Sequence, residues 1–275
     1  MTEDHLQGLA DRLVDIDGVR AVLLGGSRAR GDHTPQSDYD LGLYYEPSLD
    51  VAAIQALAHE VAGPEARVTV PGAWGPWVDG GGWFTIEGSA VDWIYRDLGR
   101  VRRSWADAQV GRFSYHAQVG HPLGVPDFAY AAEVALGIVL ADPTGELTAL
   151  QRSAREYPPA LANALVEGLW EAHFLIANAR KAVVRADTTY VAGCLFRVVE
   201  LCAHALHGRA RQWLTNEKGA VRLAAALPDA PVDFDVRAHA VLAGMGSTPK
   251  QLALTIDAAE ELLKATVAAC ENNSE

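Results

Sequence analysis

The stretch Leu23–Tyr44, LLGGSRARGDHTPQSDYDLGLY, decides how the N-terminal part of the chain is interpreted. An apolar run over Arg20–Gly26 ends in glycines and predicts a buried strand. A second run over Tyr39–Tyr45 is rich in β-forming residues and alternates in character, so it predicts another strand. A short basic turn follows the first run, and Ser37-Asp38-Tyr39-Asp40 opens the second.

Asp38 and Asp40 stand two residues apart at the start of this second strand. Residues i and i+2 of a strand point to the same face, with their α-carbons ~6–7 Å apart. Two carboxylates that converge in this way repel each other unless a cation lies between them. Magnesium suits the position because it takes one or two carboxylates together with substrate phosphates. Alone, the pattern fits a solvated turn equally well.

The Gly26-Ser27 turn carries groups suited to a phosphate. Gly26 has no Cβ, so its backbone can approach a phosphate closely. Backbone N–H groups at a following helix start can bind an anion, the Ser27 hydroxyl can donate a hydrogen bond, and Arg28 adds positive charge. A lone Gly-Gly-Ser also fits an ordinary tight turn.

Together these elements resemble the DNA polymerase β superfamily of nucleotidyltransferases. The shared pattern is Gly-Ser at the end of a strand, ten intervening residues, and Asp-x-Asp on the next strand. The resemblance implies a third metal-binding carboxylate on a later strand, and Asp92 within the apolar segment Ala90–Tyr95 meets that expectation. A lone aspartate there is costly without partners, and a metal removes that cost.

The segment Gly75–Leu98, GPWVDGGGWFTIEGSAVDWIYRDL, resembles a bacterial branch of the superfamily that includes antibiotic (aminoglycoside-type) nucleotidyltransferases. Asn216-Glu217-Lys218-Gly219 resembles the same branch. The resemblance implies an α+β fold. A small mixed β-sheet catalytic domain would be followed by an all-α helical bundle that closes the active-site cleft.

The activity implied is metal-dependent transfer of a nucleoside monophosphate, AMP from ATP, to a hydroxyl group with release of pyrophosphate. Two Mg²⁺ ions would be bound by the three carboxylates Asp38, Asp40 and Asp92. The residues that would bind the triphosphate are Gly26, Ser27, Arg28 and Lys218, the last one reaching in from the helical domain.

The general base is left between two residues. Asp92 could contact both a metal and the acceptor, and we expect it to be the base. Glu133, within Tyr130-Ala131-Ala132-Glu133, falls in the first predicted helix of the second domain and would touch only the acceptor. Glu133 also fits an exposed helix residue with no catalytic role.

The rest of the pattern predicts two domains, 1–115 and 116–275. In the first we expect helices over 6–16, 49–61 and 97–110, a third strand over 67–70, and a hairpin of 83–87 with 90–95. In the second we expect alanine- and leucine-rich helices over 129–141, 145–156, 159–186, 189–208, 216–226, 233–243 and 248–270, separated by prolines.

Three tryptophans, Trp74, Trp77 and Trp83, crowd the loop before the predicted hairpin. Aromatic rings there could stack on a base or cover a sugar. They could equally belong to the core beneath the sheet, and for Trp83 we expect the core.

The 275-residue chain has 35 acidic and 23 basic residues and a net charge of −12. Long nucleic acid is not expected as a partner, because phosphate binding needs a basic face. An acidic protein attracts cationic small molecules. Together with this charge, the resemblance to antibiotic nucleotidyltransferases implies a cationic, hydroxyl-bearing acceptor such as an aminoglycoside-like natural product. Two alternatives stay open: a protein- or RNA-modifying nucleotidyltransferase acting as a toxin or signalling enzyme, and a catalytically inactive nucleotide-binding module.

The N-terminus is polar and acidic, unlike a signal peptide. The sequence has no uninterrupted apolar run of about 18 residues, so no membrane span is expected and we expect a cytoplasmic protein. Cys194 and Cys202 lie in an apolar helical stretch and are expected in the core.

Overall fold

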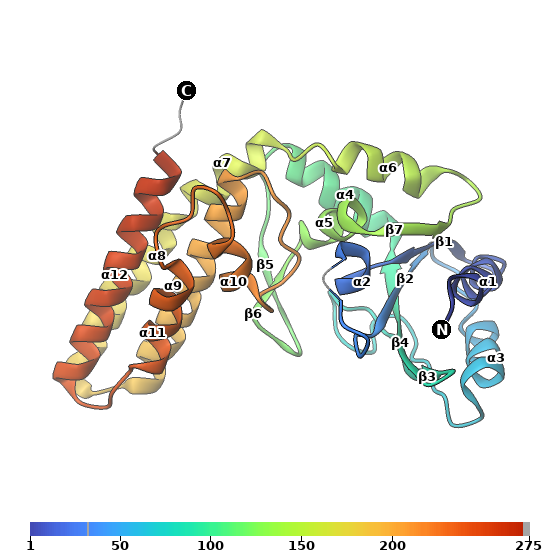
Figure 1. Cartoon of the computed structure of the whole chain (residues 1–275), viewed down its shortest axis with the longest axis horizontal. Coiled ribbons are helices and arrows are strands. Elements are labelled where there is room, and N and C mark those ends of the chain that lie inside the picture. Colours follow the sequence, from blue (N-terminus) through green and yellow to red (C-terminus); the bar gives the residue numbers. More distant parts are fainter. Residues whose placement is uncertain (32, 272–275) are drawn as a thin grey trace. The chain divides into compact units, whose positions relative to one another are not determined.

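A computed structural model describes residues 1–31 and 33–271, which form two compact units. Unit 1 comprises Met1–Asp107 and Phe113–Glu156, and unit 2 comprises Ala108–Arg112 and Tyr157–Glu275 (Figure 1). The division falls later in the chain than the predicted break between 115 and 116. The reason is that the segment after this break adds a helix and a strand to the sheet of unit 1.

A five-stranded mixed sheet organises unit 1, with strand order β3-β4-β2-β1-β7. The strands are β1 (Val19–Leu24), β2 (Tyr39–Tyr45), β3 (Gly81–Ile86), β4 (Ser89–Asp97) and β7 (Ile138–Ala141). β2 and β4 are parallel, whereas the other neighbours are antiparallel. The predicted mixed sheet and the predicted hairpin are confirmed.

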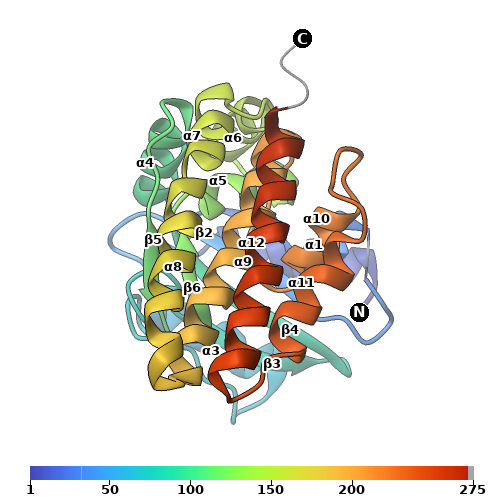
Figure 2. The ribbon, with the colours of Figure 1, turned by 90° about the vertical axis from the view of Figure 1, so that its left-hand side faces the viewer.

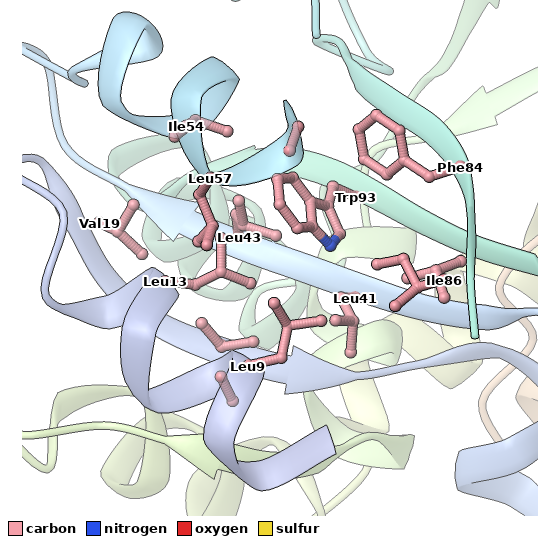
Figure 3. Packing of buried hydrophobic residues seen from close by; sticks show 14 of the residues in the cluster. Leu9, Leu13, Val19, Leu41, Leu43, Ile54, Leu57, Phe84, Ile86 and Trp93 are labelled. Carbon is pink, nitrogen blue, oxygen red and sulfur yellow. The ribbon is translucent and has the colours of Figure 1, made fainter. Parts of the chain in front are cut away.

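Helices cover both faces of this sheet (Figure 1). They are α1 (Glu3–Val14), α2 (Gly26–Arg30), α3 (Val51–Ala62), α4 (Leu98–Gln109), α5 (Ala129–Leu136) and α6 (Glu146–Ala154). On one face, Leu13 of α1 and Ile54 of α3 pack with Leu41, Leu43 and Trp93 of the sheet (Figure 3). On the other face, residues of α4, α5 and α6 pack against β1 and β2.

Strand alternation decides which side chains reach the site. Leu41 and Leu43 of β2 enter the core beneath α1 and α3. Because successive side chains of a strand point to opposite faces, Asp40, Gly42 and Tyr44 face the other way. Tyr44 lies in the core formed with α4, α5 and α6. Asp40 is therefore placed on the face that α5 covers.

The segment predicted as one helix over 129–141 is instead α5 followed by β7. The helix ends at Gly137, and Ile138–Ala141 then pairs antiparallel with β1. A Cβ on Gly137 would collide with Leu23 of β1, so the glycine permits this close approach. Ile138 and Val139 are β-branched, which favours a strand once a partner is available.

Two further segments differ from prediction. The predicted third strand over 67–70 forms no ladder, although the Thr69 N–H donates to the Gly81 carbonyl over 2.8 Å. Residues near the expected domain boundary form a separate hairpin of β5 (Tyr115–Gln118) and β6 (His121–Pro126). The hairpin is local, with Gly120 at φ +83° in its turn.

Unit 2 is helical in its described residues, as predicted. Its helices are α7 (Pro159–Glu167), α8 (Leu169–Ala182), α9 (Thr188–Arg209), α10 (Ala220–Ala225), α11 (Phe234–Ala243) and α12 (Pro249–Glu271). The predicted helix over 159–186 is divided near Gly168 into α7 and α8. α9 packs against the other helices of the unit and runs beside α8 and α12 (Figure 2).

Among the described helices, α9 is the one whose length and composition would suffice to cross a membrane. In its most apolar window 67% of the residues are buried within the protein. That burial is typical of the central helix of a helical bundle. Cys194 and Cys202 lie on α9 and are buried, as expected.

Candidate active site

Two of the predicted site carboxylates lie on neighbouring strands. β2 and β4 run parallel in a register that pairs Asp40 with Asp92. Adjacent strands lie ~4.8 Å apart, so the two residues are neighbours on one face of the sheet. Both are half-buried, whereas Asp38 is exposed just before β2 begins.

The glycine-rich turn meets Asp40 directly. The Gly25 N–H donates to the Asp40 carbonyl over 2.8 Å. At Gly26 a Cβ would overlap the Asp40 carboxylate, and φ is +62°, in the left-handed region. Only glycine meets both conditions without strain. The structure therefore brings the Gly-Ser turn and the Asp-x-Asp strand together, and Ser27 stands in the first turn of α2.

The Asp40 carboxyl lies among other acids. Burial raises its pKa, and the negative charges of Glu133 and Asp38 raise it further. Arg96 and Arg30 act in the opposite direction with smaller effect. A carboxylate with this balance of neighbours gains stability from a bound cation.

The donor set fits magnesium, although it is not a ready-made cage. In residues 1–31 and 33–271, no group of three or more His, Cys, Asp or Glu side chains is arranged to hold a metal ion. Asp40 and Asp92 are neighbours with hard oxygen donors beside a turn where a Cβ would intrude. Magnesium usually completes such a partial set with water and substrate phosphates.

Arg28 has an internal role in the structure. Its guanidinium donates from Nη2 to the Ser37 carbonyl over 2.6 Å and from Nε to the Asp38 carbonyl over 3.0 Å. It also lies over the Tyr39 ring, 3.7 Å from the centroid. Arg28 therefore holds the loop that presents Asp38, and its predicted contact with the triphosphate stays a prediction.

Glu133 lies on α5 in unit 1, outside the helical unit where it was expected. Both of its carboxylate oxygens accept from Arg96, Oε1 from Nε over 2.9 Å and Oε2 from Nη2 over 2.6 Å. Oε1 also accepts from the Tyr44 hydroxyl over 3.1 Å. The pair is largely buried, with side chains 11% and 22% exposed, and Gly42 leaves room for it. Glu133 is thus half of an internal ion pair.

The prediction that Trp83 lies in the core is wrong. Its side chain is 65% exposed, because Phe84 and Ile86 occupy the core-facing positions of β3. The Trp83 ring stacks on Trp74 with centroids 4.1 Å apart and planes 4° from parallel. Trp77 is half-buried instead and stacks on His116 at 3.8 Å.

Lys218, the last predicted nucleotide-binding residue, belongs to unit 2. It is exposed in the turn before α10, where its backbone N–H donates to Asn216 Oδ1 over 2.8 Å. Its predicted reach toward the triphosphate stays a prediction.

Two further charged residues of unit 1, Arg96 and Asp79, were not singled out from the sequence. Arg96 follows Asp92 by four positions on β4 and so shares its face, which was an available signal. Asp79, only 2% exposed, accepts from Arg100 Nη1 over 2.7 Å and from the Tyr45 hydroxyl over 3.0 Å. Nothing in the local sequence of Asp79 predicts those two distant partners.

Residues 6–71 match a protein family described as "Nucleotidyltransferase domain". The matched part includes the Gly26-Ser27 turn, Asp38 and Asp40, and it ends before Asp92. Over these residues the chain is therefore similar to a nucleotidyltransferase domain, and this similarity supports a transferase.

A solved structure called a nucleotidyltransferase-like protein, from Exiguobacterium sibiricum 255-15, is similar to the chain at 12% identity. The similarity covers 97% of this chain and 77% of that one, with a TM-score of 0.47. No curated protein matches this chain.

Proposed function

We propose that the protein transfers AMP from ATP to a hydroxyl group of a small cationic acceptor, such as an aminoglycoside-like natural product, and releases pyrophosphate. The observation that carries this proposal is the contact between the Gly25–Gly26 turn and Asp40. The contact supports the proposal because it brings the N–H groups of the turn beside a carboxylate that is surrounded by other acids. A magnesium–triphosphate complex has the complementary chemistry.

In the proposed reaction the acceptor oxygen attacks the α-phosphorus of ATP. The bond from that phosphorus to the bridging oxygen of the β-phosphate breaks, and pyrophosphate leaves with its electron pair. Gly26 and Ser27 bind the triphosphate through N–H and O–H donors. Asp38, Asp40 and Asp92 would hold Mg²⁺, which would supply charge neutralisation at the attacking and leaving oxygens.

Asp92 takes the acceptor proton in this proposal. Its position beside Asp40 puts it next to the metal-binding strand. Glu133 is less suited, because both of its oxygens already accept from Arg96. Protonation of Glu133 would cost that buried pair its charge balance.

The charge of the protein supports the proposed acceptor class. The chain carries a net charge of −12, and the charges of Asp38 and Glu133 both act on Asp40. Such a field raises the local concentration of cations and repels a polyanion. Amino groups on the acceptor would be attracted, whereas long RNA would not.

The test is an incubation of the purified protein with each of the four ribonucleoside triphosphates, Mg²⁺ and a panel of aminoglycosides. Pyrophosphate release and mass spectrometry of the small molecules are the measurements. The expected result is an AMP adduct on an aminoglycoside, absent with Asp40→Asn. An adduct on a protein or an RNA would replace this proposal with a macromolecule-modifying activity. Absence of pyrophosphate release under all conditions would point to an inactive nucleotide-binding module.

A further inference from the structure

The stacked pair of Trp74, which is half-buried, and Trp83, which is exposed, forms an aromatic platform in unit 1. Trp83 leaves 65% of its side chain exposed, although the ring is large enough to anchor a core. The two rings lie parallel at 4.1 Å, a geometry that presents one flat, polarisable surface. Exposure of so much aromatic area has a cost in water, and binding of a ligand would offset it.

The platform adjoins the candidate active site through the sheet. Trp83 of β3 pairs in register with Asp92 of β4, which in turn pairs with Asp40 of β2. These three strands are consecutive in the sheet (Figure 1). Their register therefore sets the three residues in a row across one face. With strands ~4.8 Å apart, Trp83 is one strand from Asp92 and two strands from Asp40.

The loop that carries Trp74 is held in place by one buried side chain, Gln118 of β5. Its Nε2 donates to the Trp74 carbonyl over 2.8 Å, and its Oε1 accepts from the Trp77 N–H over 3.0 Å. Gly75 between them has φ +134°, and a Cβ there would lie 2.6 Å from Gln118 Oε1. The platform is therefore pre-organised, which lowers the entropy lost on ligand binding.

We propose that Trp74 and Trp83 form the acceptor subsite, on which an amino-bearing, cationic ring stacks with its hydroxyl directed toward Asp92. This inference rests on the proposed nucleotidyl transfer. Tryptophan is the best aromatic partner for a cation, and the acids of the row add attraction for amino groups.

The order of the strands favours the acceptor over the nucleobase as the ligand of the platform. The phosphate-binding turn follows β1, on the far side of β2 from β4 and β3. The triphosphate and the platform thus lie on opposite sides of the Asp40–Asp92 pair. In-line transfer needs the acceptor and the leaving pyrophosphate on opposite sides of the α-phosphorus, which matches this arrangement.

Isothermal titration with the aminoglycoside kanamycin, and with neutral maltotriose as a comparison, tests the subsite without any need for turnover. Trp83→Ala should weaken kanamycin binding at least about tenfold, the size of a well-formed cation–π contact. Trp170→Ala is the matched control, because that tryptophan is 68% exposed but lies on α8 in unit 2. It should leave binding unchanged. Trp83→Phe should retain part of the affinity.

Kanamycin binding that is equal in Trp83→Ala and the unaltered protein overturns the subsite, as does no binding of kanamycin by either. An equal loss in Trp170→Ala, or tighter binding of maltotriose than of kanamycin, overturns it as well. A loss of Mg²⁺–ATP affinity in Trp83→Ala without a loss for kanamycin would assign the platform to the nucleobase instead. If kanamycin binding depends on Trp83 but no triphosphate releases pyrophosphate, nucleotidyl transfer fails while the platform remains a cation-binding site.

Discussion

Unit 1 and unit 2 both bury ionisable side chains, but they compensate the burial in different ways. In unit 1 the buried acids Asp79 and Glu133 are paired with Arg100 and Arg96. In unit 2 the buried groups Glu200 and His204 lie on α9, where burial favours their neutral forms. It raises the pKa of Glu200 to about 7 and lowers that of His204 to about 3.

The difference shows that buried side chains stay charged in unit 1 and are neutral in unit 2. An ion pair retains full charges in a region of low dielectric, where they act strongly on a ligand. A neutralised side chain is tolerated by a core and exerts little field. The charged groups around Asp40 belong to the first kind, which supports the placement of the chemistry in unit 1. Asp40 itself is the exception, since acids outweigh bases around it.

Replacement of Asp40 should have the largest effect on activity. Asp40→Asn should reduce pyrophosphate release on the order of a hundredfold or more, because an amide is a much weaker magnesium ligand than a carboxylate. Without metal its melting temperature should hold or rise, because repulsion with Asp38 and Glu133 is removed. Steady-state kinetics and calorimetry are the measurements.

Asp15→Asn, at an exposed position after α1, is the control and should behave as the unaltered protein does. Normal turnover by Asp40→Asn would show that the Asp-x-Asp strand does not bind the catalytic metal.

Disruption of a buried pair in unit 1 should give the largest loss of stability. Glu133→Ala leaves Arg96 buried without its partner and should lower the free energy of unfolding by about 3–5 kcal/mol. Glu60→Ala breaks an exposed pair with Arg12 and should cost far less, because solvent screens exposed ion pairs. Urea denaturation of both variants measures the contrast. Similar small losses would mean that the Arg96–Glu133 pair is not held as described.

Glu133→Gln adds a kinetic readout to this pair. With Asp92 as the base, its single-turnover rate at saturating Mg²⁺ and ATP should fall by much less than the hundredfold expected for loss of a general base. A nearly inactive variant that still binds ATP would transfer that role to Glu133.

The neutral form of Glu200 in unit 2 should make the free energy of unfolding depend on pH. The folded-state pKa of Glu200 is about 7 against an ordinary value of 4.5, so its contribution to stability is fully present below pH 4.5. This contribution is lost as the pH rises through 7, in all about 3 kcal/mol. Glu200→Gln should therefore match the unaltered protein near pH 4 and be more stable at pH 8.

Chemical denaturation at a series of pH values measures this difference, with Glu167→Gln at an exposed position of α7 as the control. A pH-independent difference between Glu200→Gln and the unaltered protein would contradict the neutralised state of Glu200.

The smallest effect concerns the glycine turn. Gly26 and Gly31 both have positive φ, at +62° and +78°, but only Gly26 faces the Asp40 carboxylate. Gly31→Ala should cost about 1 kcal/mol from backbone strain alone. Gly26→Ala should cost about 1–2 kcal/mol more, because strain and overlap combine. It should also lower activity. Thermal unfolding of both variants measures the two losses of stability. Equal losses would argue against the close approach of Gly26 to Asp40.

Local pattern was sufficient for the elements that carry the chemistry. The apolar run before Gly26, the alternation over β2 and the turn at Glu87-Gly88 each depend on neighbours in sequence, and each strand was predicted within a few residues. The placement of Asp40 opposite Asp92 required one further assumption, that their strands are adjacent. The family resemblance supplied that assumption, and the register of β2 with β4 shows the two strands side by side.

Other features were settled by contacts between residues far apart in sequence. Ile138–Ala141 is apolar enough for a helix, and its pairing with β1 makes it a strand. Trp83 is a large apolar residue of the kind found in protein cores. In β3, however, it lies on the face opposite to the core residues Phe84 and Ile86. Glu133 is polar in an apolar helix, and Arg96, distant in sequence, makes it an ion-pair partner. Hydrophobic periodicity indicates which residues prefer burial. It does not indicate which distant strand or side chain each residue will contact, because those contacts form only when the sheet assembles.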